Sequence, residues 1–423
     1  MGTPDGSGGV VTASPEAVAT PTDVPEDDNL LEFDPHWCLF WGKGVTGFHL
    51  DIWAPYLRHS ANRYVIMAGE DRFSDAVRAT VAGLPNVRII EPYALAKPWL
   101  KLCPSFRGFL YVGTKAANFD VVNSFGGKSH VWLGHGESDK VYNAFRTASL
   151  YDSMFVARYG VVDRYPRAIR RWVASGACAI GTPILDGAVK DPWTTPRPIR
   201  TILYAPTWEG HGERADYQSL REVGPALIEA MPRLRERGVS VIMRPHPSTG
   251  SRVPALRGIR DAIFEAGAQR GGDKAADFSA ADVIVSDISG VTAEYLFTEK
   301  PAIMPVTERL MLLGKDDERL GAEYPWVYRW PVDSVSLLDR LVELETSDPL
   351  RDQRSRSARE MFRGHRSIEE AADSFDLALD SVIWRKTPVP VRWVYESRRR
   401  IPFLRSAQLG ALARRLRRRR RRH

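Results

Sequence analysis

The feature that most constrains this chain is a regular alternation of short β-rich runs with helix-forming segments. In the first half it predicts helices at 50–59 and 74–82 and strands at 38–41, 64–68, 87–90, 109–112, 130–133 and 154–157. In the second half it predicts helices at 220–237, 253–266 and 291–300 and strands at 201–204, 240–243, 283–286 and 302–305. Strands separated by helices are typical of βαβ units, so each half should form a parallel sheet.

A proline-rich stretch separates the two halves. Residues 190–200, KDPWTTPRPIR, contain three prolines, which remove the backbone donors that helices and strands need. We therefore expect a first domain at 35–190, a linker at 191–200 and a second domain at 201–383, with one or two closing helices within 351–383. Such domains would face each other across a cleft. Ligands of open α/β sheets bind beyond the carboxyl ends of the strands, so the chemistry should be sought there.

The two ends of the chain differ in composition from the rest. Residues 1–34 contain eight acidic residues and no Lys or Arg, whereas residues 385–423 contain fifteen Lys and Arg and one acidic residue. The acidic segment is rich in Gly, Pro, Ser and Thr and is expected to be disordered. Between these segments the charges nearly balance, so the net charge of +7 comes from the basic tail.

The basic tail, residues 384–423, indicates a partner for the chain. Leu409, Leu412 and Leu416 fall on one helical face beside the six arginines at 417–422, an arrangement that suits an anionic membrane surface. The alternatives are a solvated tail and one that binds any polyanion, RNA included. The nearly neutral body gives no reason to expect a specific nucleic-acid surface.

The same sequence bears on localisation. No apolar run approaches the roughly 18 residues of a membrane span, and the N-terminus lacks the pattern of a secretory signal. Three cysteines lie far apart, as is usual in a reducing compartment. We expect a cytoplasmic protein, peripheral on the inner face of the plasma membrane.

The first polar strand end is His135, in VWLGHGESDK. Glycines on both sides allow a sharp turn that would expose the imidazole, which could take a proton from an attacking hydroxyl. Lys140, a few residues later, could face an anion. The alternative is a turn histidine that only binds the backbone.

Two further strand ends lie in the second half. Thr207 follows the strand in TILYAPTW and could offer its hydroxyl to a ligand. In VIMRPHPSTG, Arg244 and His246 stand two residues apart among prolines that stiffen the backbone. Arginine matches phosphate geometry and histidine adds a donor, so a phosphate site is predicted. A structural salt bridge is the alternative.

The fourth strand end is the SDISG sequence, which leads into a helix. Ser286, Asp287, Ser289, Gly290 and Thr292 place hydroxyls and free backbone N–H groups at the start of that helix, where an anion is favoured. The alternative is that Ser289 simply caps the helix.

Several common functional motifs are missing from the sequence. It contains no GxxxxGK[ST] loop, HExxH, GxSxG or EF-hand pattern, and no aspartate-rich cluster. We expect no dedicated metal site and no required cofactor, although Mg²⁺ could assist.

The HG…K, YAPTW, RPHP and SD-x-S motifs, in this order, resemble those of the CDP-glycerol glycerophosphotransferase (teichoic acid polymerase) family. The resemblance implies a GT-B-like fold, with two Rossmann-like domains facing a cleft. It also implies transfer of glycerol phosphate, or a related polyol phosphate, from a CDP-alcohol to a hydroxyl of a lipid-linked cell-wall or capsular polymer, with release of CMP.

The resemblance also implies roles for individual residues. His135 matches the expected base, and His246 with Arg244 match the RPHP residues that hold the donor pyrophosphate. Ser286 and Ser289 match the serine pair near the donor phosphates, and Thr207 matches the threonine of YAPT. Two other functions remain open: a GT-B glycosyltransferase that uses a nucleotide sugar, and a non-catalytic polyanion-binding protein.

Overall fold

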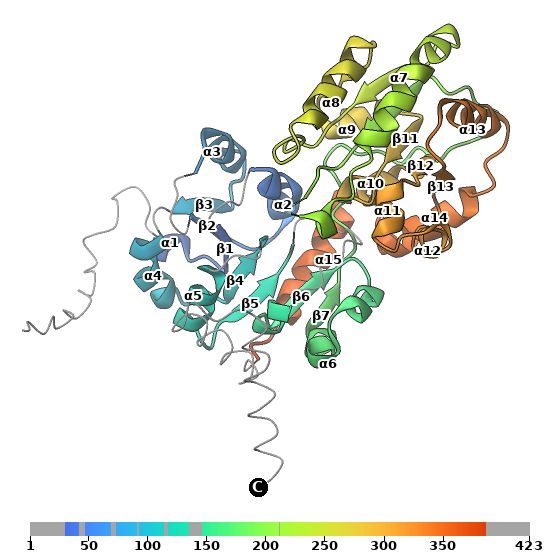
Figure 1. Cartoon of the computed structure of the whole chain (residues 1–423). Helices are drawn as coiled ribbons and strands as arrows, with labels where there is room; N and C mark the ends of the chain where they lie inside the picture. Colours follow the sequence, from blue (N-terminus) through green and yellow to red (C-terminus); the bar gives the residue numbers. More distant parts are fainter. Residues whose placement is uncertain are drawn as a thin grey trace, which may run out of the picture.

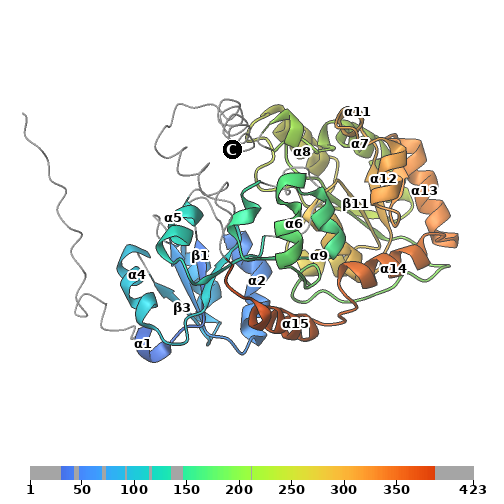
Figure 2. The same ribbon diagram turned by 90° about the horizontal axis from the view of Figure 1, so that it is seen from below.

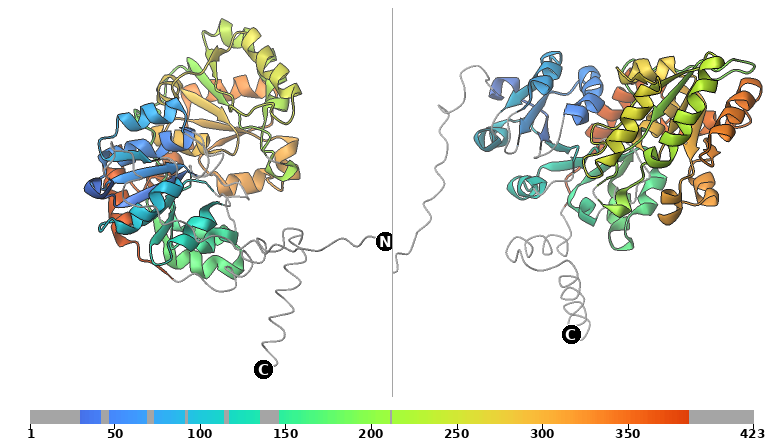
Figure 3. Two further views of the ribbon diagram at one scale, coloured as in Figure 1. Left: turned by 90° about the vertical axis from the view of Figure 1, so that its left-hand side faces the viewer. Right: turned by 45° about the horizontal axis from the view of Figure 1, so that its top comes forward.

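The computed structural model describes residues 30–41, 47–68, 73–90, 93–113, 117–134, 146–210 and 212–385. These residues form two α/β lobes, each built around one parallel sheet (Figures 1 and 3). The expected α/β fold with two Rossmann-like domains is therefore confirmed.

The first lobe holds a seven-stranded sheet in the order β3-β2-β1-β4-β5-β6-β7. Its strands are β1 (Trp37–Trp41), β2 (Tyr64–Ala68), β3 (Val87–Ile90), β4 (Gly108–Tyr111), β5 (Ser129–Trp132), β6 (Ser153–Val156) and β7 (Ala177–Ala179). Its helices are α1 (Leu30–Phe33), α2 (Gly47–His59), α3 (Asp75–Ala82), α4 (Tyr93–Leu102), α5 (Ala117–Ser124), α6 (Arg167–Gly176) and the 3₁₀ helices η3 (Arg146–Leu150) and η4 (Tyr159–Arg164). All residues of β4, β5 and β6 are buried, because helices cover both faces of the sheet.

The second lobe holds a six-stranded sheet in the order β10-β9-β8-β11-β12-β13. Its strands are β8 (Thr201–Ala205), β9 (Ser240–Met243), β10 (Gln269–Arg270), β11 (Val283–Ser286), β12 (Ala302–Pro305) and β13 (Tyr328–Trp330). The helices that follow residue 200 are α7 (Leu220–Glu236), α8 (Ala255–Glu265), α9 (Lys274–Ala280), α10 (Gly290–Tyr295), α11 (Glu308–Leu312), α12 (Asp317–Glu323), α13 (Ser334–Thr346), α14 (Arg351–Met361), α15 (Ile368–Ser381) and the 3₁₀ helices η5 (Glu213–Ala215) and η6 (Leu296–Thr298).

The strand order decides where ligands can bind. In the second sheet the chain moves outward in one direction through β8, β9 and β10, and then in the other through β11, β12 and β13. The order reverses between β8 and β11, and a crevice opens at such a switch point beyond the carboxyl ends of the strands. Thr207 and Asp287 follow these two strands, so the topology brings their loops together.

The predicted strands agree with the observed ones to within one residue at each end. The prediction missed β7, β10 and β13. These strands have three, two and three residues. Strands this short show too little alternation or β-branched enrichment to be recognised from sequence.

The last helix, α15, crosses back to the first lobe, where it lies beside α2 (Figures 1 and 2). The ring of Phe375 packs 5.6 Å from Trp53 and 5.9 Å from Tyr56, measured between centroids. Asp376 accepts hydrogen bonds from the hydroxyl of Ser60 and the backbone N–H of Ala61. The expected second domain, 201–383, includes α15. In the structure the apolar face of α15 packs on the first lobe instead.

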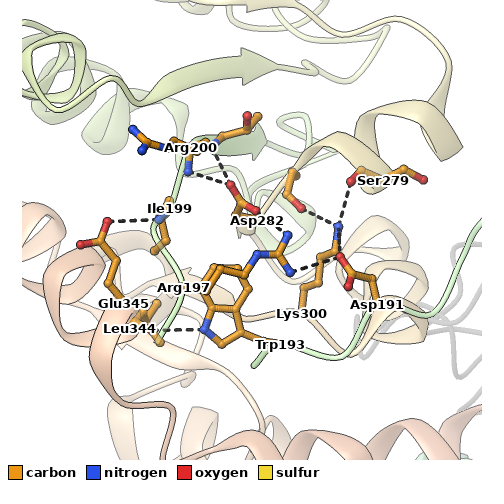
Figure 4. Close-up of polar contacts among 12 residues, drawn as sticks. Asp191, Trp193, Arg197, Ile199, Arg200, Ser279, Asp282, Lys300, Leu344 and Glu345 are labelled. Carbon is orange, nitrogen blue, oxygen red and sulfur yellow. Dashed lines mark hydrogen bonds and ion pairs between the residues drawn. The ribbon is translucent and has the colours of Figure 1, made fainter. Parts of the chain in front are cut away.

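The proline-rich linker is fixed against the second lobe rather than loosely solvated (Figure 4). Trp193 is fully buried and its indole N–H donates to the carbonyl of Leu344. Arg197 forms a 3.0 Å ion pair with Asp282, whose other oxygen accepts the backbone N–H of Thr201 at the start of β8. The linker thus holds the first strand of the second sheet in place.

Lys300 closes the same network (Figure 4). Its ammonium donates to the carbonyls of Ser279 and Ala281, at the carboxyl end of α9, and lies 3.2 Å from Asp191 in the linker. A cation is favourable at a helix C-terminus because the last carbonyls lack partners. Burial nevertheless lowers the pKa of Lys300, and Asp191 counters that effect.

The structure corrects part of the expected N-terminal disorder. Residues 30–33 form α1, and Asp34 accepts the backbone N–H of Ser105 and pairs with Arg63. These residues therefore belong to the folded first domain. The rest of that segment and all but the first two residues of the predicted basic tail lie outside the described residues. Within the described residues, no helix combines the length and apolarity needed to cross a membrane.

Candidate active site

The RPHP segment continues the pairing of β9 with β8 past the end of both strands. The backbone N–H of Arg244 donates to the carbonyl of Tyr204 at 2.9 Å, and that of His246 donates to Pro206 at 3.3 Å. The prolines between and after these residues cannot donate, so only alternate N–H groups join the pairing. Arg244 and His246 are consequently held beside the loop that carries Thr207.

Asp287 joins that loop to the end of β11. Its carboxylate accepts the backbone N–H of Thr207 at 2.7 Å and that of Ser219 at 3.3 Å. Asp287 is completely buried, and a buried carboxylate is tolerated only where it is hydrogen-bonded. The sequence makes Asp287 a candidate for the phosphate site, and the structure shows that its carboxylate fixes the loops at the switch point.

Arg244 places a guanidinium at this edge of the sheet. Its Nη1 atom donates to the carbonyl of Gly272 at 2.6 Å and to Asp277 at 2.8 Å. The salt bridge that was the alternative to phosphate binding is therefore present. Among the described residues, Nε and Nη2 of Arg244 have no partner, so the guanidinium still has donors for a ligand.

The ring of His246 has a defined tautomer. Its Nδ1 atom accepts the backbone N–H of Ser248 at 3.0 Å, which places the ring proton on Nε2. Trp208 stacks on the ring, with centroids 5.6 Å apart and planes 14° from parallel. This arrangement makes His246 a hydrogen-bond donor through Nε2, rather than a proton acceptor at that atom.

The hydroxyls of the SDISG motif mostly bind one another and the backbone. Ser286 donates to the carbonyl of Ala205 at 2.8 Å, and Thr292 donates to the carbonyl of Asp287. Both are about 1% exposed, so their hydroxyls are engaged inside the protein, and their contact with a phosphate stays a prediction. Ser289 caps α10 by accepting the N–H of Thr292, as its alternative interpretation held, and is slightly more exposed at 8%.

Glu209 is a residue that the sequence analysis did not recognise as part of this site. Its carboxylate accepts backbone N–H groups from Gly250, Arg252 and Val253 at 3.1, 2.7 and 3.1 Å. Burial alone would raise the pKa of Glu209, but these N–H donors hold it below its usual value. Glu209 directly follows YAPTW and precedes Gly210. An acidic residue at this strand end is the sequence signal that could have indicated its role. Glu209 ties the loop after RPHP to the end of β8.

The first lobe approaches this edge through α2. The indole N–H of Trp53 donates to the carbonyl of Gly134 at 2.9 Å, so the end of β5 is attached to that helix. On α2, burial raises the pKa of Asp51, and the charge of Lys274 at the start of α9 partly counters that shift. Lys274 in turn pairs with Glu294 on α10 at 2.8 Å.

Two expected residues of the first lobe fall outside the described part of the chain. His135 and Lys140 lie within residues 135–145, which the structure does not describe. Gly134, directly before His135, is described and has a φ of +71°, a conformation that glycine adopts readily.

Part of the second lobe resembles a known protein family. Residues 186–310 match the model of the CDP-glycerol:poly(glycerophosphate) glycerophosphotransferases, and this span contains Thr207, Arg244, His246 and Ser289. The second lobe therefore carries a segment similar to these enzymes. No curated protein matches its sequence.

Two solved structures with TM-scores of at least 0.50 agree with a GT-B-like fold for this chain. A putative UDP-N-acetylglucosamine 2-epimerase from Listeria monocytogenes is similar at a TM-score of 0.51 and 14% identity, over 82% of this chain and 96% of that one. MnaA of S. aureus, solved with UDP, gives a TM-score of 0.50 and 12% identity, over 84% and 99% of the two chains. The wall teichoic acid polymerase TagF gives 0.49 and 13%, over 86% and 90%.

The sequence leads us to expect no dedicated metal site. Among the described residues, no three His, Cys, Asp or Glu side chains gather as metal ligands would. Whether Mg²⁺ assists this chain stays a prediction for experiment.

Proposed function

We propose that this chain transfers glycerol phosphate, or a related polyol phosphate, from a CDP-alcohol to a hydroxyl of a lipid-linked cell-wall or capsular polymer and releases CMP. One observation carries the proposal: Arg244, His246 and the loop of Thr207, all within the family-matched span, meet at the switch point of the second sheet. Anionic ligands of open α/β folds bind at such a point.

The second domain supplies charge and hydrogen bonds to the donor. Nε and Nη2 of Arg244 would bind the donor phosphates in the fork geometry that arginine offers. Nε2 of His246 would donate to the same group, and Ser289 and Gly290 would present the start of α10 to it. Fixed donors aimed at the phosphates stabilise the charge on departing CMP without any reorganisation.

The first domain supplies the base. The acceptor oxygen attacks the β-phosphorus in line, the bond from that phosphorus to the CMP oxygen breaks, and His135 takes the hydroxyl proton. Phosphoryl transfer depends mainly on positioning and charge stabilisation, so no covalent enzyme intermediate is needed. His135 follows Gly134, which α2 holds through Trp53.

The proposal is tested by nucleotide release. The full chain is incubated with a membrane extract and, separately, with CDP-glycerol, CDP-ribitol and UDP-sugars, and the released nucleotide is identified. Release of CMP that depends on the acceptor is expected. Release of UDP alone would assign the cleft to a glycosyltransferase. If no donor gives any nucleotide while RNA binds through the tail, the chain is a polyanion-binding protein.

The proposed reaction takes place at the membrane surface. The fifteen basic residues after position 384 would hold the enzyme on the anionic inner face of the plasma membrane, where a lipid-linked acceptor is available. Each basic residue near such a surface contributes about 1 kcal/mol before screening by salt.

A further inference from the structure

A cavity of about 550 Å³ lies at the junction of the two lobes, apart from the RPHP loop. Arg158, Gly160 and Arg164 line it from the first lobe, at the start and along the length of η4. Lys315 and Arg319 line it from the second lobe, together with residues of α12 and α14. Its size is within the range of sites for small molecules, roughly 300–1,000 Å³.

The charges around this cavity do not balance. Its lining contains four basic residues and two acidic ones, Glu323 and Glu360. The carboxylate of Glu323 is shared by two cations, because it pairs with Lys315 and lies 3.1 Å from Arg319. A bidentate or shared carboxylate cannot neutralise two cations, so the cavity keeps an excess of positive charge that favours an anion.

The ion pairs leave part of this charge accessible. The side chain of Arg319 is 60% exposed, and that of Arg158, 3.3 Å from Glu360, is 32% exposed. Pairs of this kind contribute little to stability, so an arriving phosphate can compete for the arginines. Gln353 and Ser357 on α14 add neutral hydrogen-bonding groups that suit hydroxyls.

Two buried aromatic residues, Tyr324 and Trp326, form part of the cavity lining. Trp326 and Tyr324 are 3% and 6% exposed and pack with their ring centroids 6.3 Å apart. Packed aromatic rings change position little, so this part of the lining is preformed.

The strand order relates the cavity to the candidate active site. Arg158 lies two residues after β6, which pairs with β5, the strand that leads to His135. Lys315 follows β12, which pairs with β11, the strand that leads to Asp287. In each sheet, a cavity residue therefore follows the strand that pairs with the one leading to an expected active-site residue.

We propose that this cavity binds a phosphodiester segment of the acceptor polymer, an anionic chain that also bears hydroxyl groups. The inference rests on the proposed function and deepens it, because it assigns the acceptor its own binding site. A chain that enters between the lobes would place one hydroxyl at the active site while an earlier phosphate contacts Arg158 and Arg319. The donor phosphates already have Arg244 and His246 on the neighbouring edge of the second sheet.

Direct binding tests the site without requiring turnover. A short glycerol phosphate oligomer is titrated into the full-length protein by calorimetry, with saturating CDP-glycerol present and absent. We expect R158Q and R319Q each to weaken binding of the oligomer by about tenfold, as loss of one charge-assisted contact does. The matched control is R366Q, because Arg366 forms an exposed pair with Glu370 at the same four-residue spacing as Arg319 with Glu323, but just before the start of α15.

Each outcome decides the proposal. Unchanged oligomer affinity in both variants overturns it, as does no binding to the wild-type protein. Competition between the oligomer and CDP-glycerol would assign the cavity to the donor and also overturn it. Equal loss in R366Q would show a general charge effect and would count against a specific site.

Turnover separates this inference from the proposed function. If the chain releases CMP, R319Q should raise the acceptor concentration for half-maximal rate by about tenfold and leave the KM for CDP-glycerol unchanged. If the chain transfers nothing but the variants still lose the oligomer, the proposed function fails and the anion site stands. The unfolding midpoints of all variants should equal that of the wild type, which would exclude misfolding as the cause of weaker oligomer binding.

Discussion

The carboxylate of Asp287 accepts the backbone N–H of Thr207 at 2.7 Å, and this bond joins the ends of the two strands on either side of the switch point. A second bond, from the N–H of Ser219, extends the connection to the start of α7. One buried side chain thus fixes three loops whose positions decide where a ligand can sit.

Replacing Asp287 should destabilise this edge of the sheet strongly. Asp287→Ala leaves two N–H groups without a charged acceptor, which should cost about 3 kcal/mol of unfolding free energy. Asp333→Ala is the control, since Asp333 caps α13 at the surface and its loss should cost about 1 kcal/mol. Urea unfolding of both variants measures the difference, and equal costs would contradict the role given to Asp287.

Loss of the proposed base should reduce turnover without weakening donor binding. His135→Ala should lower kcat by 10²–10⁴-fold with little change in the KM for CDP-glycerol, because a general base acts in the transition state. His59→Ala provides the control, since His59 lies at the exposed end of α2 near Glu369. Nearly full turnover in His135→Ala would reject the assignment.

Much of this architecture follows from the sequence, and the reasons for the failures are physical. The strands that lead to Arg244 and Ser286 are apolar runs bounded by prolines, glycines or turn residues, so their ends could be placed by pattern alone. The position of α15 could not, because an amphipathic helix shows which face it buries and not which lobe receives that face. Sequence alone likewise does not separate Ser289, which is 8% exposed and caps α10, from Ser286 and Thr292, which are about 1% exposed and donate to backbone carbonyls.

The role of Glu209 predicts a change in both donor binding and acid stability. Glu209→Gln keeps the size of the side chain but loses the charge that holds Gly250, Arg252 and Val253, so the KM for CDP-glycerol should rise by about tenfold. The folded-state pKa of Glu209 is depressed, so its stabilisation is present above about pH 4.5 and is lost as the pH falls through the folded value.

Urea unfolding at several pH values checks the acid effect. Glu209→Gln should lose less stability than the wild type on acidification below about pH 4.5. Glu213→Gln, four residues later at an exposed position, should behave as the wild type does in both assays. Wild-type donor KM in Glu209→Gln would show that the loop after RPHP does not need this carboxylate.

The basic tail should be removable, provided that its first residues are kept. The backbone N–H of Arg385 donates to Asp152, and its guanidinium lies 4.0 Å from the ring of Trp172. A chain that ends at residue 388 should therefore keep the wild-type unfolding midpoint and lose binding to anionic vesicles. A chain that ends at Ile383 should lose both, because Asp152 then loses the N–H of Arg385 and keeps only that of His130.

Vesicle flotation at physiological salt and thermal unfolding measure the two effects. Vesicles of neutral lipid are the control, since electrostatic attraction requires an anionic surface. Unchanged binding of the chain ending at 388 would reject the tail as the membrane anchor. Equal stability of the two truncated chains would show that Arg385 contributes nothing to the fold.

Two buried groups in the first lobe should give opposite pH dependences. Burial lowers the pKa of His130 to about 4, and burial raises that of Asp152 to about 6. The two residues are in contact, since the backbone N–H of His130 donates to the carboxylate of Asp152 at 2.8 Å. Tyr111 donates its hydroxyl to Nδ1 of His130, which fits the neutral ring.

The signs follow from which state binds the proton. Between about pH 6.5 and 4 the unfolded chain protonates His130 and the folded one does not, so acidification costs stability, by about 3 kcal/mol over that range. Between about pH 6 and 4 the folded chain protonates Asp152 and the unfolded one does not, so acidification adds stability of similar size. In the wild type these contributions nearly cancel.

Single substitutions should separate them. Asp152→Asn leaves the effect of His130 alone, so stability should fall more steeply than in the wild type as the pH is lowered from 6 to 4. His130→Gln leaves the effect of Asp152, so stability should fall less steeply or rise. Urea midpoints at pH 4 and 6 for the three proteins measure the slopes. Parallel slopes in all three would mean that neither group is perturbed as its burial requires.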